Sequence, residues 1–243
     1  MQYWALTDPG AVREQNQDAY QVEKLDKNTL LCVVCDGMGG AKAGNVASTL
    51  AAEAFTREVK KNWSSSLSGK RLEQMLRDAV KLANFTVYDQ ARQVEDFSGM
   101  GTTLVAAVIR SKKATVVNVG DSRAYFITDD GIKQVTTDHS LVQLMIARGE
   151  LTPEKAKRYP GKNLITRAIG TEEHVECDVF DLDIRKDTYL LLCSDGLSNL
   201  LDDQEILFEI AYSQAKEKCC ERLLDIAKKR GAPDNVTSVL VAL

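Results

Sequence analysis

The order of apolar and polar positions divides the chain into blocks with strand-like and helix-like patterns. Short apolar runs bounded by turn residues predict strands, and apolar residues that recur every three or four positions predict helices. On these grounds we expect strands at residues 3–7, 29–35, 103–109, 115–119, 124–127, 175–184, 189–193 and 237–243. We expect helices at residues 45–60, 72–91, 141–147, 203–214 and 219–230.

The predicted elements come in groups: strands, a helix pair, strands, a second helix pair and a last strand. A regular alternation of strand and helix is typical of a parallel sheet, so this grouping instead favours an α+β domain with antiparallel sheets and paired helices outside them. Residues 140–170 interrupt the strands with a short helix, two prolines and many charges, and we interpret this stretch as a flap. We expect one domain over residues 1–243.

Composition and charge narrow the class of protein. The chain has 243 residues, of which 44% are hydrophobic, and this is enough for one substantial core. Its 31 basic and 35 acidic residues provide no general attraction for nucleic acid or an anionic membrane. No apolar run approaches the roughly 20 residues of a membrane span, and the first residues lack the features of a secretory signal. We therefore expect a cytoplasmic protein with no nucleic-acid or membrane partner.

Three predicted strands are followed within two residues by an aspartate, namely Asp36, Asp121 and Asp195. A carboxylate in this position lies at the rim of the core, where desolvation is costly. Two more aspartates, Asp18 and Asp234, are predicted in polar turns. If these groups converge, each pair about 4 Å apart repels by roughly 4 kcal/mol at an effective dielectric of about 20, so a cation must lie among them. Oxygen ligands alone favour Mg2+, Mn2+ or Ca2+, although any one aspartate on its own is more often a turn residue or a helix cap.

Eight short segments carry a resemblance to a known family. They are TDPGAVR (7–13), NQDAY (16–20), DGMGG (36–40), SGMGTTL (98–104), GDSRAY (120–125), LITRAIG (164–170), CSDGL (193–197) and DN (234–235). In this order they resemble the motifs of the metal-dependent, type 2C protein phosphatases, specifically the compact bacterial branch. The resemblance spans almost the whole chain. It implies a four-layer α-β-β-α sandwich with two central antiparallel β-sheets and a binuclear Mn2+ or Mg2+ centre at one end of them.

The resemblance also implies which residues carry the reaction. Asp36 would bridge the two ions, and the Gly37 carbonyl would bind one of them. Arg13 would bind the substrate phosphate, because a guanidinium offers two parallel donors to phosphate oxygens. A water activated by the metals would then hydrolyse phosphoserine or phosphothreonine without a covalent enzyme intermediate.

The remaining aspartates would complete the metal site. Asp195 and Asp234 would bind the second ion, and Asp18 would hold water bound to a metal. Asp121 together with Asp195 would form the third metal site that the bacterial branch contains, so two or three ions are expected.

Three positions depart from patterns in the wider family. Met38 stands where many eukaryotic members have a histidine that is proposed as a general acid, and Ala41 stands where bacterial relatives often have histidine. Gln17 replaces a glutamate of the eukaryotic pattern and suits an amide that orients water. The group that protonates the leaving alkoxide is therefore left open.

Other polar residues near these motifs are predicted to be structural. Arg123 and Arg167 are expected to be ion-pair partners. His139 is expected to be a surface residue or the neighbour of a helix cap.

The resulting hypothesis is a metal-dependent serine/threonine protein phosphatase, a monomer that acts on phosphorylated proteins and opposes a serine/threonine kinase of the bacterial type. A catalytically weak regulatory module that binds phosphoproteins is the alternative from another class. A metal-dependent nuclease or phosphodiesterase is disfavoured, because the chain is acidic and has no basic stripe.

Overall fold

The computed structural model describes residues 1–40, 43–110, 112–156 and 159–243. The strands in these ranges are β1 (Gln2–Asp8), β2 (Asp18–Asp26), β3 (Thr29–Met38), β4 (Gly101–Thr102), β5 (Leu104–Ile109), β6 (Lys113–Val119), β7 (Arg123–Thr128), β8 (Gly131–Gln134), β9 (Asp178–Asp183), β10 (Tyr189–Cys193) and β11 (Val236–Ala242). The helices are α1 (Ala43–Asn62), α2 (Lys70–Gln93), α3 (Leu141–Ala147), α4 (Pro153–Ala156), α5 (Asp195–Ser198), α6 (Asp203–Ala211) and α7 (Cys219–Lys229). Short 3-10 turns lie at Glu95–Phe97 and Lys216–Lys218.

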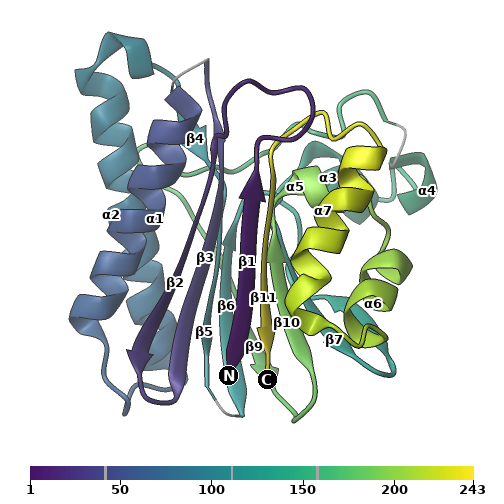
Figure 1. Ribbon diagram of the computed structural model, residues 1–243. Helices are drawn as coiled ribbons and strands as arrows, with labels where there is room; N and C mark the ends of the chain where they lie inside the picture. The colour runs from purple at the N-terminus through teal and green to yellow at the C-terminus, as the bar shows by residue number, and fades with distance from the viewer. Residues whose placement is uncertain (41–42, 111, 157–158) are drawn as a thin grey trace.

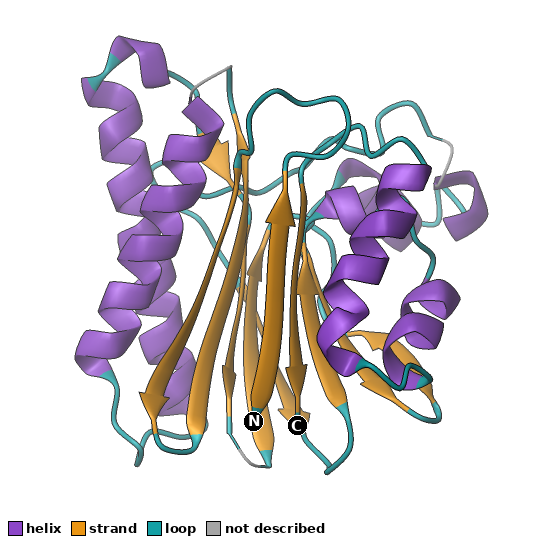
Figure 2. Cartoon of the chain, viewed as in Figure 1, coloured by secondary structure: helices purple, strands orange, loops and turns teal. Residues whose placement is uncertain are grey.

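Two antiparallel sheets pack face to face between helices (Figure 1). One sheet has the order β1-β11-β10-β7-β8, and the other has the order β2-β3-β5-β6-β9, with β4 paired to β3. Helices α1 and α2 cover the outer face of the second sheet, and α6 and α7 cover the first, as the purple and orange layers of Figure 2 show. The predicted α-β-β-α sandwich is confirmed.

Strand β3 shows why a run of apolar residues forms a strand here. Side chains alternate between the two faces of a strand. Leu31 and Val33 pack beneath α1 and α2, whereas Cys32 and Val34 face the other sheet. A strand that is buried on both faces needs apolar residues at every position. Its carboxyl end is therefore the first place where a polar group can appear.

The helices bury one face each. Phe55 of α1 and Leu76 of α2 are fully buried against the second sheet, and Ile206 of α6 and Leu223 of α7 against the first. Truncating a buried Phe of this kind to Ala costs about 3–5 kcal/mol. The apolar layers thus hold the sandwich together without help from the polar ends of the strands. None of the helices in the described ranges is long and apolar enough to cross a membrane.

The sequence predictions differ from the structure in several elements. Strands β2 and β8 were not predicted, and Asp18, expected in a turn, is instead the first residue of β2. The strand expected at residues 175–184 is shorter and covers Asp178–Asp183. The helix expected at residues 203–214 ends at Ala211. Strand β2 was missed because it lies at the sheet edge and mixes charged and apolar residues on both faces.

The predicted flap lies between β8 and β9 and contains α3 and α4. Its base is closed by hydrogen bonds from the Leu141 amide to the Leu164 carbonyl at 2.8 Å and from the Thr166 amide to the His139 carbonyl at 2.7 Å. Figure 1 places α3 and α4 at the end of the sandwich toward which β1 points. Residues 157–158 of this stretch lie outside the described ranges.

Candidate active site

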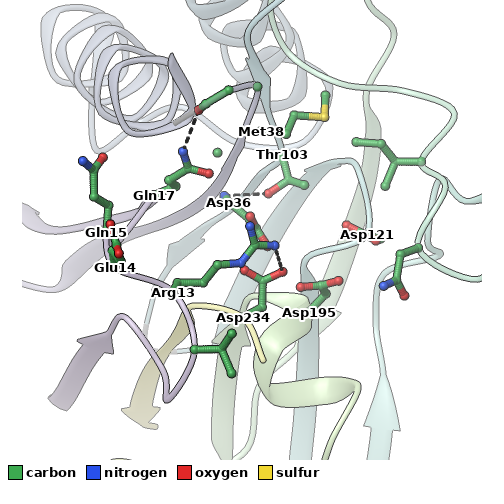
Figure 3. A pocket seen from close by; sticks show the side chains of 16 residues that line it. Arg13, Glu14, Gln15, Gln17, Asp36, Met38, Thr103, Asp121, Asp195 and Asp234 are labelled. Carbon is green, nitrogen blue, oxygen red and sulfur yellow. Dashed lines mark hydrogen bonds and ion pairs between the residues drawn. The ribbon is translucent and has the colours of Figure 1, made fainter. Parts of the chain in front are cut away.

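A cavity of about 700 Å3 opens at one end of the two sheets. Six of the seven residues predicted for the site line it: Arg13, Asp36, Gly37, Asp121, Asp195 and Asp234 (Figure 3). The seventh, Asp18, is buried beside them, because it stands opposite Asp36 in the register of β2 and β3. The structure therefore brings together all the predicted residues.

Strand direction explains why these carboxylates meet. Strands β3 and β6 are both antiparallel to β5, so they run in the same direction; Asp36 lies near the carboxyl end of β3, and Asp121 follows β6 at the same edge. In the other sheet, Asp195 follows the end of β10. Asp234 precedes β11, which is antiparallel to β10, so Asp234 and Asp195 lie at the same end.

Asp18 is the most enclosed of these carboxylates. Its Oδ2 accepts hydrogen bonds from the hydroxyls of Ser194 and Thr237, both at 2.7 Å. Its Oδ1 is buried and has no hydrogen-bond partner among the described residues. A buried carboxylate oxygen without a partner is costly unless a water or a cation satisfies it. This orphaned atom fits a place next to a hydrated metal ion.

Gly37 provides a backbone position that no other residue could occupy. A Cβ at this position would lie 2.0 Å from the Gly44 carbonyl oxygen and 2.6 Å from that of Gln17. The Gly37 amide donates to the same Gln17 oxygen at 3.1 Å. Glycine therefore lets three chain segments meet at the cavity wall.

The carboxyl groups of the cluster resist ionisation. Burial, followed by the charges of Asp18 and Asp195, raises the pKa of Asp36 well above its ordinary value. Burial is also the main reason that the pKa values of Asp18 and Asp121 rise to about 7. The pKa of Asp195 is raised by burial and then by Asp234. A divalent cation among these groups would offset their repulsion and favour their ionised forms.

Arg13 lies across the mouth of the cluster. Its Nη2 donates to Asp234 Oδ2 at 3.0 Å, and both side chains are about half exposed. An exposed ion pair of this kind contributes about 0–1 kcal/mol, so a phosphate can compete for the guanidinium.

The carboxylates of the described ranges do not yet form a coordination shell. No group of three or more Asp, Glu, His or Cys side chains in these ranges is arranged to hold an ion directly. Arg13 engages one oxygen of Asp234, and two hydroxyls engage one oxygen of Asp18. The donor set has the chemistry for Mn2+ or Mg2+, and binding would require small movements, including release of Asp234 by Arg13.

Asn235 is a functional residue to which the sequence analysis gave no role, although it lies in the matched DN segment. Its side chain amide donates to the carbonyls of Pro9 at 3.0 Å and Gln15 at 2.9 Å. Its Oδ1 accepts from the Gln17 amide at 2.7 Å. Asn235 thereby fixes the loop that carries Arg13 next to the neighbouring Asp234.

Thr103 was also missed. Its Oγ1 accepts from the Asp36 amide at 2.9 Å and is hydrogen-bonded to the Ser122 hydroxyl at 2.7 Å. The Thr103 amide donates to the Asp36 carbonyl at 2.9 Å. The only sequence signal was its position in the SGMGTTL segment.

The arginines predicted to be structural do form ion pairs. Arg123 pairs with Asp138 at 2.7 Å, and Arg167 pairs with Asp178 at 3.2 Å. The surface expectation for His139 was wrong, because this residue is buried.

His139 is held by both its ring and its backbone, and its Nε2 lies 3.2 Å from Arg167 Nη1 and 3.3 Å from Asp178 Oδ2. It is the neighbour of Ser140, which caps α3, and its Nδ1 accepts from the Gly120 amide at 3.1 Å.

Three positions depart from the family pattern. Met38 lines the cavity, and the Gln17 side chain donates a hydrogen bond to the Gly40 carbonyl at 3.1 Å. Ala41 lies outside the described residues.

Comparison with known proteins agrees with this geometry. The sequence profile of the family described as Protein phosphatase 2C matches residues 11–240. The serine/threonine phosphatase stp of Listeria welshimeri is 35% identical over 235 residues, which cover 97% of this chain and 93% of that protein. The protein phosphatase PhpP of Streptococcus pneumoniae is 32% identical over 245 residues, which cover 100% of this chain and 98% of that protein.

Solved structures share the fold. The serine/threonine phosphatase Stp1 from Staphylococcus aureus superposes with a TM-score of 0.90 at 37% identity, over 99% of this chain and 94% of that one. The catalytic domain of the phosphatase PstP, solved in complex with two manganese ions, superposes with a TM-score of 0.83 at 34% identity, over 98% and 96% of the two chains. With its fold and nearly its whole length matched, this chain belongs to the protein phosphatase 2C family.

Proposed function

We propose that this chain is a metal-dependent protein phosphatase that hydrolyses phosphoserine and phosphothreonine in protein substrates. The observation that carries the proposal is the gathering of five aspartates around one cavity, with Arg13 at its mouth and an unsatisfied oxygen on Asp18. The family is metal-dependent, and the relatives named above are serine/threonine phosphatases.

The acidic residues are assigned to the metal ions. Two Mn2+ or Mg2+ ions would be held by Asp36 as the bridge, by the Gly37 carbonyl, and by Asp195 and Asp234. Asp18 would act through water. When bound, the ions would supply Lewis acidity and offset the negative charge on the phosphoryl oxygens.

A third ion is assigned to Asp121 together with Asp195. The two residues follow strands of opposite sheets, and both line the cavity. The charge of Asp195 contributes to the raised pKa of Asp121, so the two carboxyl groups share one electrostatic environment.

Arg13 is assigned to the substrate phosphate. Among the described residues, the guanidinium is held only by its exposed pair with Asp234, so a dianionic monoester can attract it away from that carboxylate. This exchange would offset one of the two negative charges of the phosphate and release an oxygen of Asp234 at the same time. Arg13 therefore couples substrate binding to the completion of the acidic site.

The flap is assigned a role in substrate access. Asn163 and Ile165 line the same cavity as the aspartates, and the flap is closed at its base by backbone hydrogen bonds. We place the protein, as a monomer, in the cytoplasm, where it would oppose a serine/threonine kinase.

Phosphate release from a phosphothreonine peptide tests this function. We expect release that depends on added Mn2+, and much slower hydrolysis of a diester such as bis(p-nitrophenyl) phosphate. Tight binding of the phosphopeptide without turnover would instead support a regulatory binding module. Faster hydrolysis of the diester than of the monoester would support a phosphodiesterase.

A further inference from the structure

A second cavity lies next to the acidic one, on the other side of the loop between β1 and β2. Its volume is about 530 Å3, and it is lined by Gln15, Asn16, Asn45, Val46 and Phe97. Gln15 lines both cavities, so the two share a wall. In Figure 3 the Gln15 side chain points away from the carboxylates, on the side of the loop opposite to Asp121.

The second cavity differs from the first in its chemistry. Among the residues that the structure describes, none that lines it is ionisable, whereas the first contains carboxylates and Arg13. Val46 and Phe97 are half-buried and pack against the core between α1, α2 and the second sheet, so they form a supported apolar floor. Gln15 and Asn45 are exposed at the rim and can offer amide groups to a peptide backbone.

The walls of this cavity are held in place without a ligand. The side chain of Asn16 donates to the Thr7 hydroxyl at 2.8 Å and accepts from the Asp18 amide at 3.1 Å. Asn235 donates to the carbonyl of Gln15 at 2.9 Å. The turn that carries Phe97 is closed by a hydrogen bond from its amide to the Val94 carbonyl at 3.0 Å. A preformed pocket loses little affinity to ordering on binding.

Given the phosphatase function proposed above, on which this inference rests, we propose that the second cavity binds the side chain of a residue that flanks the phosphorylated residue and selects an apolar side chain there. The occupant is a segment of the substrate, because the cavity is separated from the phosphate site only by the wall that Gln15 contributes to both. An extended peptide advances about 3.3 Å per residue, so a side chain near the phosphorylated residue can reach across one loop. A charged side chain would lose hydration there without gaining an ionic partner.

Phosphothreonine peptides that differ at one flanking position at a time test the proposal. Each position from three before to three after the phosphothreonine is occupied by Leu, Ala or Asp in an otherwise constant peptide. With Mn2+ present, we expect one position at which Leu raises kcat/KM about tenfold over Ala. In Phe97→Ala the ratio between Leu and Ala at that position should fall to within about twofold. Asn45→Lys should shift the preference at the same position toward Asp.

The ratio of kcat/KM between the Leu and Ala peptides is measured within one variant, so a general loss of activity would not change this ratio. Thermal unfolding checks that each variant is folded, and Asn45 is exposed, so its substitution removes no core contact. Phe85→Ala is the matched control, because Phe85 is 60% exposed on α2 and lines neither cavity. Its peptide preferences should equal those of the wild type.

The outcomes separate the subsite from the catalytic function. Wild-type protein that hydrolyses p-nitrophenyl phosphate with Mn2+ but shows no flanking preference would overturn the subsite and leave the phosphatase function intact. A Leu preference that survives in both Phe97→Ala and Asn45→Lys would also overturn it. Absence of any monoester turnover in the wild type would overturn the proposed function and the subsite together.

Discussion

At the residue scale, Asp36 is held by its backbone rather than by partners for its carboxylate. Its amide and its carbonyl are both hydrogen-bonded to Thr103, while its side chain faces the other acidic groups of the cavity. Burial and the neighbouring carboxylates raise its pKa. A group held in so unfavourable a place is typical of a site where stability is given up for function.

The substitution Asp36→Asn tests whether this carboxylate lowers stability and is needed for activity. We expect phosphopeptide turnover with Mn2+ to fall at least about a hundredfold, because even outer-shell partners of a metal account for ten- to a hundredfold. We also expect the metal-free variant to unfold at a higher temperature than the wild type at pH 8, because the neutral amide removes like-charge repulsion. Turnover assays and metal-free thermal unfolding measure the two effects.

The matched control for this substitution is Asp225→Asn. Asp225 is exposed on α7 and lines neither cavity, so both its turnover and its unfolding temperature should equal those of the wild type. Wild-type activity in Asp36→Asn would rule out the proposed metal bridge. A lower unfolding temperature of that variant would rule out the burial and repulsion of the Asp36 charge as the dominant effect.

At the element scale, two buried asparagines fix the segments on either side of the cavity. Asn235 makes three hydrogen bonds to the loop between β1 and β2. Asn84 of α2 makes three to the chain that follows the flap, with the carbonyls of Glu172 and Glu173 and the amide of Gly170 as partners. The loop that carries Arg13 thus depends on one side chain from the far end of the chain.

The substitution Asn235→Ala should lower the free energy of unfolding by about 2–4 kcal/mol, because three buried hydrogen bonds are lost and their partners are left unsatisfied. It should also raise KM for a phosphopeptide, since Arg13 and Gln15 lose their positioning. Asn235→Asp should not restore either property, because an oxygen would replace the amide that donates to two carbonyls. Urea unfolding and steady-state kinetics provide the measurements.

Asn84→Ala is the control for stability, because it loses an equivalent set of bonds away from the loop that carries Arg13. We expect a similar loss of stability with a smaller rise of KM than in Asn235→Ala, at a temperature where both variants are folded. An equal rise of KM in both variants would show that the effect of Asn235 is general destabilisation rather than positioning.

The elements that the sequence predicted well are those whose packing is visible in a local period. The amphipathic helices α1 and α2 and the apolar strands β3 and β5 were all expected within a few residues of their ends. Strand β8 has only four residues. Strand β2 shows no clean alternation of apolar and polar residues, because it lies at a sheet edge and has residues that pack against both apolar clusters on the two sides of its sheet. Such strands are defined by their partners rather than by their own sequence.

At the scale of the whole molecule, the apolar layers hold together a fold in which buried acidic groups repel one another at one end of the two sheets. The pKa values of Asp18 and Asp121 are about 7 in the folded protein, against about 3.9 for an unfolded aspartate. At pH values between about 3.9 and 7 the folded state binds more protons than the unfolded state, so the free energy of unfolding falls as pH rises. Stability that is fully present below about pH 4 is lost as the pH passes through 7.

The metal-free protein should therefore be more stable at pH 5.5 than at pH 8, with a difference on the order of 2 kcal/mol or more. Saturating Mn2+ should reverse this trend, because metal binding requires deprotonated carboxylates and stabilises only the folded state. Urea unfolding at both pH values, with and without Mn2+, measures the difference.

Asp18→Asn is the informative variant for this linkage. The amide oxygen can still accept from Ser194 and Thr237 but no longer titrates, so the pH dependence of the metal-free protein should flatten. Greater stability of the metal-free wild type at pH 8 than at pH 5.5 would contradict the proposed electrostatics.

The sequence by itself determined the grouping of strands and helices, the antiparallel α+β architecture and the identity of the acidic residues. These features are local: an apolar run, a helical period and a carboxylate after a buried strand all act through neighbours in the chain. Tertiary structure decided which groups meet, because the decisive contacts join distant residues. Asp18 meets Ser194 and Thr237, and Asn235 holds Gln17, across separations of 176 to 219 positions. The packing of two sheets brings these strand ends into one cavity, and only that packing creates the burial that raises their pKa values.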